Sequence, residues 1–258
     1  QSGAGRTITT TEPKFVPDEP VEITFAESVK ARIRLVDCVG YTVAEAKGYM
    51  DESGPRLVRT PWFDHPIPFQ EAAELGTRRV ISEHSTIGLV VTTDGSITDL
   101  ARSEYEEPEA RVVGELQALG KPFIVALNSI HPNSPETQAL ARRLQEEYGV
   151  TVLPLDCLRM TQEDILRLLT EVLMELPLRE FNLRLPKWVR ELKEDHWLRQ
   201  IYEDLAWETV GRLKRVKDVQ ELAVQAFQES EYVQLVQVES VDWGTGKVTL
   251  GGVVDGQP

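Results

Sequence analysis

Residues 123–127 read Phe-Ile-Val-Ala-Leu, a short continuous apolar run that is typical of a strand covered on both faces. Comparable apolar runs occur at 87–91 and at 150–155, and each of the three is followed by apolar residues at helical spacing. The repeated order of strand and helix predicts right-handed βαβ units that form a mainly parallel sheet. The fold class predicted for this part of the chain is therefore α/β.

The helices predicted in this region carry recognisable end signals. Ser134 and Pro135 are the residue types favoured at the N-cap and the first position of a helix. Thr161 and Asp164 have the spacing of a capping box. We interpret the acidic cluster at 104–109 as a solvated helix start, where the helix dipole favours negative charge.

Two runs near the start of the chain, 21–25 and 31–35, alternate apolar and polar residues on either side of a short polar link. This pattern predicts a β-hairpin, which would supply an antiparallel edge of the parallel sheet. The segment after Asp37 is rich in Gly, Pro and charged residues, as expected of a functional or mobile loop. A helix is predicted from Phe69 to Glu83.

The chain changes character after Pro177. A helix-rich stretch runs from Trp188 to about Gln228, and two short β-like segments follow it. We predict two domains, residues 1–178 and residues 179–258. The second is interpreted as the beginning of an α+β domain, helix-rich at first and then made of short strands.

The charge and composition exclude several functional classes. A hydrophobic fraction of 41% in 258 residues can fill a core, which argues against wholesale disorder. The formal net charge of −14 argues against unaided binding to nucleic acid or anionic lipid, since both attract positive charge. The basic residues within 212–217 are interpreted as an exposed helix face or a partner surface.

Cys38 and Cys157 are the only cysteines, too few for a disulfide framework or a Cys-rich zinc site, so a reducing cytoplasm is the simplest compartment. The four histidines lack metal-ligand spacing. No apolar run approaches the ~20 residues that span a bilayer. The N-terminus has neither an initiator Met nor an apolar signal core, so we expect that the chain begins inside a longer protein.

The four residues at 37–40, Asp-Cys-Val-Gly, follow a predicted strand directly. In P-loop nucleotide hydrolases, the Asp of such a D-x-x-G loop lies near Mg²⁺, and the Gly lets its backbone N–H approach the γ-phosphate. Asp37 and Gly40 are therefore candidates for metal and nucleotide binding. The pattern is short, however, and an Asp that closes a strand is also a common turn former.

Thr10 and Thr11 lie in a threonine-rich segment upstream of the predicted hairpin. A threonine loop, an antiparallel hairpin and a D-x-x-G loop occur in this order in the switch region of Ras-like GTPases. There a Thr hydroxyl, a hard oxygen ligand, binds Mg²⁺ and senses the γ-phosphate. Thr11 and Asp37 are thus the candidate Mg²⁺ ligands, and the alternative is a polar N-terminal segment without a ligand.

The third strand end, Asn-Ser-Ile-His at 128–131, lies where guanine-specific enzymes carry N-K-x-D. Asn128 fits the first position of that motif, Ser129 replaces its Lys, and His131 stands in place of its Asp. Without the carboxylate, the loop loses its means of selecting guanine. Asn128 and Ser129 are nucleotide-binding candidates, and the alternative is an Asn that ends a strand before a turn.

A phosphate-binding loop of the form G-x-x-x-x-G-K-[ST] should precede the threonine segment, and the chain begins after that point. The stretch Gly244-Thr245-Gly246-Lys247 lacks the first Gly, the final Ser or Thr and a following helix. We therefore reject it as a phosphate loop.

Together these residues resemble the stage IV sporulation protein A family, the morphogenetic ATPases of spore-forming Firmicutes. The resemblance covers about residues 5–228 and fades in the tail. The stretches that carry it are Gly5–Thr7, Thr10–Pro17, Ile33–Thr42, Glu71–Arg78, Glu83–Gly88, Thr92–Gly95 and His196–Arg199.

The resemblance implies a Ras-like P-loop NTPase domain, incomplete at its N-terminus, that uses ATP and Mg²⁺. It also implies ATP hydrolysis coupled to self-assembly on the outer forespore membrane, in the mother-cell cytoplasm, as the basement layer of the spore coat. The implied partners are further copies in a homopolymer, a small amphipathic membrane-anchoring peptide and spore coat proteins, with peripheral membrane association and no nucleic acid. The family's sensor threonines fall on Thr10 and Thr11, and its Mg²⁺-side Asp falls on Asp37.

Tyr41 occupies the position after Gly40 at which Ras-like enzymes place a water-orienting Gln. A phenol cannot present the same amide, so Tyr41 and Thr42 are weak catalytic candidates. We expect this chain alone neither to bind nor to hydrolyse ATP appreciably, because the phosphate loop supplies most of the phosphate-binding energy. Two other functions stay open, a nucleotide-independent scaffold of the same fold and a conventional regulatory GTPase.

Overall fold

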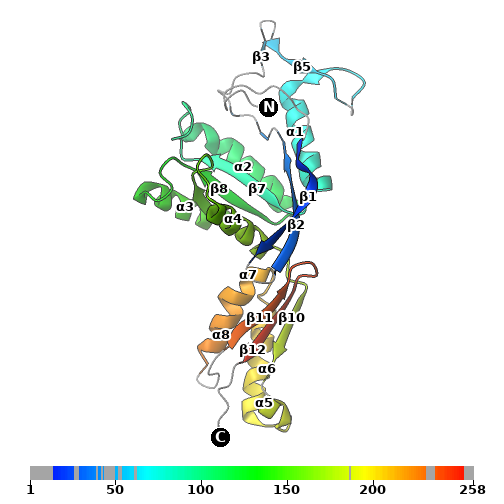
Figure 1. The fold of residues 1–258 in the computed structure, drawn as a ribbon, viewed down its shortest axis with the longest axis vertical. Coiled ribbons are helices and arrows are strands. Elements are labelled where there is room, and N and C mark those ends of the chain that lie inside the picture. Colours follow the sequence, from blue (N-terminus) through cyan, green and yellow to red (C-terminus); the bar gives the residue numbers. More distant parts are fainter. Residues whose placement is uncertain are drawn as a thin grey trace. The chain divides into compact units, whose positions relative to one another are not determined.

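The three apolar runs form neighbouring parallel strands, with β8 (Phe123–Asn128) between β7 (Gly88–Thr93) and β9 (Val152–Leu155). Residues 123–127 of β8 are all buried. Each strand is followed by a helix: α2 (Ser103–Ala118), α3 (Pro135–Tyr148) and α4 (Gln162–Met174). The parallel sheet and its alternating helices, predicted from the sequence, are confirmed (Figure 1).

The structure is a computed structural model, and it describes residues 14–25, 29–38, 40–41, 43, 50–51, 54–60, 63–185, 187–230 and 236–252. The chain divides into two compact units, residues 1–171 and residues 172–258.

One face of the parallel sheet holds the core of the first unit. Val90, Val125 and Val152 are in register across the three strands. Apolar side chains from α2 and α3 pack on this row, and the buried ones are Val113, Leu116, Ala141 and Leu144. The apolar residues spaced for a helix in the sequence are therefore the ones that cover the sheet.

The helix ends follow the predicted signals. The Ser134 hydroxyl accepts a hydrogen bond from the Thr137 backbone N–H at 3.2 Å, and Pro135 begins α3. Thr161 and Asp164 exchange the two bonds of a capping box: the Thr161 N–H donates to the Asp164 carboxylate at 2.8 Å and the Asp164 N–H donates to the Thr161 hydroxyl at 3.2 Å. Local side-chain chemistry is enough to fix these ends.

The predicted hairpin is present as β1 (Lys14–Phe25) and β2 (Val29–Asp37), which pair antiparallel. Its predicted place at the edge of the parallel sheet is wrong for the described residues, because β1 and β2 form a two-stranded sheet of their own. Alternation in a sequence reports which face of a strand is polar, and it does not specify which strand lies alongside.

Short paired segments fill the region between the hairpin and the first helix. They are β3 (Met50–Asp51), β4 (Gly54–Pro55), β5 (Leu57–Val58) and β6 (Ile67–Pro68). The predicted helix follows as α1 (Phe69–Arg79) and continues as one π-helical turn, η1 (Val80–His84). Phe69, Ala72 and Ala73 bury one side of α1.

The second unit holds a separate three-stranded sheet and its own hydrophobic core. The strands β10 (Glu180–Arg184), β12 (Lys247–Gly252) and β11 (Val236–Asp242) lie in that order, β10 parallel and β11 antiparallel to β12. The helical segments are α5 (Lys187–Glu191), α6 (Trp197–Val210), α7 (Val216–Asp218), η2 (Val219–Ala223) and α8 (Val224–Gln228). Buried Val189, Phe227, Val248 and Leu250 join the helices to the sheet.

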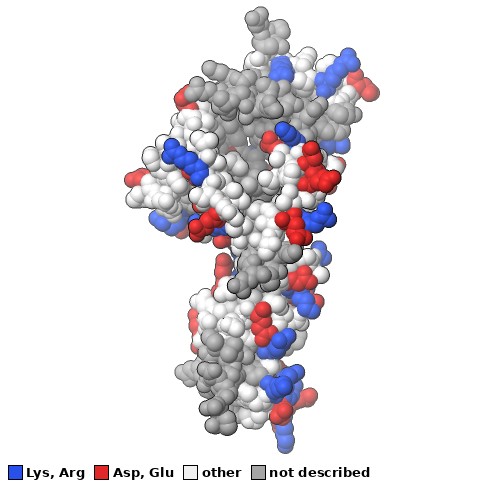
Figure 2. All heavy atoms as spheres, in the orientation of Figure 1, with Lys and Arg blue, Asp and Glu red and all other residues white. Residues whose placement is uncertain are grey.

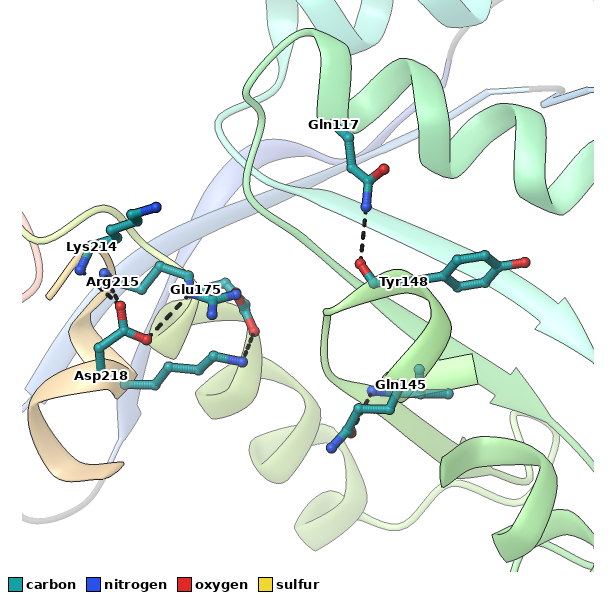
Figure 3. A network of polar contacts seen from close by, with 9 residues as sticks. Gln117, Gln145, Tyr148, Glu175, Lys214, Arg215 and Asp218 are labelled. Carbon is teal, nitrogen blue, oxygen red and sulfur yellow. Dashed lines mark hydrogen bonds and ion pairs between the residues drawn. The ribbon is translucent and has the colours of Figure 1, made fainter. Parts of the chain in front are cut away.

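A buried carboxylate anchors the start of this unit. Glu175 accepts from the Lys217 ammonium at 2.6 Å and from the Arg215 guanidinium at 3.0 Å (Figure 3). The Asp218 carboxylate accepts from the backbone N–H groups of Lys214 and Arg215. The sequence-based interpretation of 212–217 as an exposed basic face is wrong for Lys217, because a buried glutamate needs a paired cation.

On the face shown in Figure 2, basic and acidic side chains of the described residues are interspersed, without a broad basic patch. No helix in the described part of the chain has the length and apolarity needed to cross a membrane.

Gly244, Thr245 and Gly246 lie in the turn between β11 and β12, and Lys247 is the first residue of β12. The Asp242 carboxylate accepts from the N–H groups of Gly244 and Thr245, and the Gly246 N–H donates to the Asp242 carbonyl at 2.9 Å. Gly246 has φ +68°, and a Cβ there would lie 2.6 Å from the Pro177 carbonyl oxygen. This glycine is therefore required by backbone geometry.

Replacement of Gly246 by Ala should destabilise the second unit by about 1–3 kcal/mol from the positive φ alone, with the close approach to Pro177 adding to it. Urea unfolding followed by tryptophan fluorescence measures this. Gly211→Ala is the matched control, because a Cβ at Gly211 meets no atom within 4 Å. Equal stability of the two variants would contradict the requirement for glycine at position 246.

Candidate functional site

The carboxyl ends of β7, β8 and β9 lie at one edge of the parallel sheet, where open α/β folds bind their ligands. Asp94 follows β7, Asn128 ends β8, and Asp156 follows β9. The Asp94 N–H donates to the Asn128 carbonyl at 3.4 Å, and the Ser129 N–H donates to the Leu155 carbonyl at 2.9 Å. These backbone hydrogen bonds connect the three loops to one another.

Asp94 ties the loop after β7 to the start of α3. One carboxylate oxygen accepts from the Ser96 N–H at 2.9 Å, and the other accepts from the Thr137 hydroxyl at 3.1 Å. Burial raises the pKa of Asp94, but hydrogen bonds from Ser129, Ser96 and Thr137 outweigh it and hold the pKa below its ordinary value. Asp94 is thus an ionised anchor for the loops.

The two nucleotide-binding candidates on β8 have different surroundings. The Asn128 side-chain oxygen accepts from the Cys157 N–H at 3.0 Å, which links the ends of β8 and β9. Ser129 is 0% exposed, and its hydroxyl accepts from the His131 N–H at 2.9 Å. Both side chains support the loop, and their contact with a nucleotide stays a prediction. His131 itself is exposed.

Asp37 ends β2 with its side chain exposed. Gly40 has φ +78°, and its N–H donates to the Thr77 hydroxyl of α1 at 3.1 Å. The Tyr41 hydroxyl donates to the carboxylate of Glu115 on α2. The D-x-x-G loop is therefore docked on two helices. Among the described residues, no hydrogen bond or ion pair joins Asp37 to the Asp94 and Asn128 loops.

Thr10, Thr11 and Thr42 lie outside the described residues, so the proposed pairing of Thr11 with Asp37 stays a prediction. Within the described ranges, no group of three or more His, Cys, Asp or Glu could hold a metal ion. Asp37 nevertheless fits a Mg²⁺ site in its chemistry, since it presents an exposed carboxylate, a hard oxygen ligand, at a strand end.

A buried ion pair supports the end of β7. Arg102 donates to both carboxylate oxygens of Glu109 at 2.6 Å, and it also donates to the Thr92 hydroxyl at 3.0 Å and the Thr93 carbonyl at 3.2 Å. The Tyr148 hydroxyl donates to Glu109 at 2.8 Å. The ion pair thereby fixes the last residues of the strand from which Asp94 follows.

The Tyr148 carbonyl accepts from the Gln117 side chain at 2.9 Å, which joins α2 to the end of α3 (Figure 3). Glu109 is 4% exposed, so its interpretation as part of a solvated helix start is wrong. Its spacing to Val113 and Leu116, which places all three on one helix face, was the signal that could have located it.

Comparison with known proteins adds to this geometry. Residues 1–177 match the family model described as "Stage IV sporulation protein A, ATPase domain", and residues 178–255 match the model described as "Stage IV sporulation protein A, middle domain". The chain belongs to the stage IV sporulation protein A family. The sequence resemblance is confirmed, and the match to the ATPase domain includes every predicted site residue.

Three members of the stage IV sporulation protein A family show the extent of the similarity. The chain is 51% identical to the Bacillus subtilis (strain 168) protein over 246 residues, which are 95% of this chain and 50% of the relative. It is 50% identical to the Bacillus anthracis protein over 246 residues (95% and 50%) and 43% identical to the Clostridioides difficile (strain 630) protein over 250 residues (97% and 51%). The chain spans about half the length of these relatives. No solved structure matches it significantly.

Replacement of Glu109 by Gln should destabilise the first unit by about 3–5 kcal/mol, because the Arg102 charge stays buried without its partner. Urea unfolding measures this, with Glu107→Gln as the control on the exposed side of the same helix. Equal stability of the two variants would show that the Arg102–Glu109 pair carries no net energy.

The same pair predicts a dependence on pH. Burial raises the pKa of Glu109, but hydrogen bonds from Arg102, Thr92 and Tyr148 together lower it by more than burial raises it. The pKa therefore lies below its ordinary value of 4.5. The contribution of ionised Glu109 to stability is complete above that ordinary pKa, and it is lost as the pH falls through the lower folded-state value. Unfolding curves measured below pH 4.5 should lose this part of their acid dependence in the Glu109→Gln variant.

Proposed function

We propose that this chain is part of an ATP-hydrolysing morphogenetic protein that self-assembles as the basement layer of the spore coat. The observation that carries the proposal is the match of residues 1–177 to the ATPase domain of the stage IV sporulation protein A family. The reaction is hydrolysis of a phosphoanhydride bond of ATP. The proposed domains are residues 1–178, a Ras-like P-loop domain without its first strand and phosphate loop, and residues 179–258, the beginning of a middle domain.

The proposed roles of the chain's own residues follow from their surroundings. Asp37 and Thr11 hold Mg²⁺, which neutralises phosphate charge when it is bound. Gly40 offers its N–H to the γ-phosphate. Asn128 positions the base-side loops by accepting a hydrogen bond from the Cys157 N–H. Ser129 supports the same loop by accepting a hydrogen bond from the His131 N–H. Thr10 is the second sensor threonine, and Tyr41 and Thr42 remain weak candidates for orienting water.

The preference for ATP over GTP rests on His131. Guanine presents two adjacent donors, its N1–H and its exocyclic amine, to a single carboxylate in N-K-x-D enzymes. An exposed imidazole in that place has no pair of oxygens to accept both bonds. This favours the ATPase over a conventional regulatory GTPase.

The proposed assembly takes place on the outer forespore membrane, in the mother-cell cytoplasm. The names of the relatives refer to stage IV of sporulation. The partners proposed from the family resemblance are further copies of the protein, a small amphipathic membrane-anchoring peptide and coat proteins. Membrane association is peripheral and nucleic acid has no part in it.

Phosphate release from ATP tests the proposed activity in two polypeptides: these 258 residues, and a longer one that adds the residues encoded upstream. We expect turnover only in the longer polypeptide, because we propose that the phosphate loop is encoded upstream. In that polypeptide, Asp37→Asn should raise the Mg²⁺ concentration needed for half-maximal turnover by about 10- to 100-fold. Asp18→Asn is the control, an exposed carboxylate in the same hairpin.

Each rival function has its own outcome in this assay. Assembly without any turnover by the longer polypeptide would favour the nucleotide-independent scaffold. Stronger competition by GTP than by an ATP analogue would favour the regulatory GTPase. Full turnover by the shorter chain would contradict the proposed dependence on an upstream phosphate loop.

A further inference from the structure

The last residue of the D-x-x-G loop and the residue that follows it are held by helices α1 and α2. The Gly40 N–H donates to the Thr77 hydroxyl at 3.1 Å, and the next residue, Tyr41, donates its phenol to Glu115. Thr77 is 4% exposed, so its hydroxyl meets little competing water. A backbone amide has a single N–H, and that of Gly40 is already in use.

Charged residues of the same helices hold the Tyr41 side chain from two directions. Arg78 donates to Glu115 at 3.0 and 3.3 Å, so the acceptor of the phenol is itself fixed. The Arg111 guanidinium lies over the Tyr41 ring, 5.0 Å from its centroid, and donates to Glu74 at 2.7 Å. Burial, followed by the hydrogen bond to Glu115 and its charge, raises the pKa of Tyr41 well above its ordinary value. The phenol therefore stays a donor at neutral pH.

We infer that Thr77 and Tyr41 are positioning residues that hold the D-x-x-G loop against α1 and α2. The seat is this pair of contacts, Gly40 to Thr77 and Tyr41 to Glu115. In the seat, the Thr77 hydroxyl accepts the Gly40 N–H that a nucleotide phosphate would need. The inference rests on the proposed function for the identity of the competing anion. A phosphate oxygen can accept the Gly40 N–H only after that N–H has left Thr77. Because Gly40 and Tyr41 are consecutive, release of the amide also pulls on the Tyr41–Glu115 bond.

This seat has a defined effect on nucleotide binding. If the seated loop is the major state, the apparent affinity for a triphosphate is reduced by the fraction of molecules in which the amide is free. Loss of a seat contact should therefore tighten binding. A contact that only supports the fold has the opposite effect, since its loss weakens binding and stability together.

The first experiment uses the 258-residue chain without nucleotide and measures amide hydrogen exchange at Gly40. Thr77→Val keeps the shape of the side chain and removes the acceptor, so exchange at Gly40 should become about fivefold faster. Thr77→Ser keeps the hydroxyl and should exchange like the original chain. Thr170→Val is the control, because the Thr170 hydroxyl donates to the Leu166 carbonyl within α4. Unchanged exchange at Gly40 in Thr77→Val would overturn the inference.

The second experiment uses the longer polypeptide and a non-hydrolysable ATP analogue. Thr77→Val and Tyr41→Phe should each lower the apparent Kd by about fivefold, while Thr77→Ser leaves it unchanged. Weaker or equal binding in both Thr77→Val and Tyr41→Phe would overturn the seat as a competitor of phosphate. Tyr41→Phe also covers the case in which Thr77→Val fails to fold. If the unmodified polypeptide binds no nucleotide, the proposed function fails, and the exchange experiment still decides whether the seat exists.

Discussion

The first unit depends on β8 having a strand on each side. Residues 123–127 are all buried, so every backbone polar group of this strand must find its partner in the protein, and β7 and β9 supply those partners. Parallel pairing on both sides then brings three carboxyl ends to one edge of the sheet. The loops that follow them are consequently neighbours, although the residues concerned lie far apart in the chain.

The loops at this edge are fixed by buried or half-buried charges. The Arg102–Glu109 pair holds the end of β7, and Asp94 connects the next residues to α3. Such polar groups are costly to bury unless all of their hydrogen bonds are made, and those made here set a particular loop geometry. The D-x-x-G loop is fixed by other groups, the hydroxyl of Thr77 and the carboxylate of Glu115. The loops at the sheet edge and the D-x-x-G loop are therefore held by separate sets of groups.

Sequence patterns located the strands, most helix ends and the family, because each of these follows from neighbouring residues. The Ser134 cap and the Thr161–Asp164 capping box are examples. The patterns did not reveal that Glu109 is buried or that Lys217 pairs with the buried Glu175, since the charge of a side chain indicates solvent unless its partner is known. The place of the hairpin relative to the parallel sheet was missed because alternation of polar and apolar residues does not specify which strand lies alongside.

The sequence by itself determined the α/β order of the first unit, the D-x-x-G pattern at 37–40, the presence of an imidazole at His131 and membership of the family. These features are encoded by residue types at short spacing. Only the tertiary structure decided which partners the polar groups take: Thr77 for the Gly40 amide, Cys157 for Asn128, and Arg102 for Glu109. Those partners are 37, 29 and 7 positions away along the chain, and folding alone brings each pair within hydrogen-bonding distance.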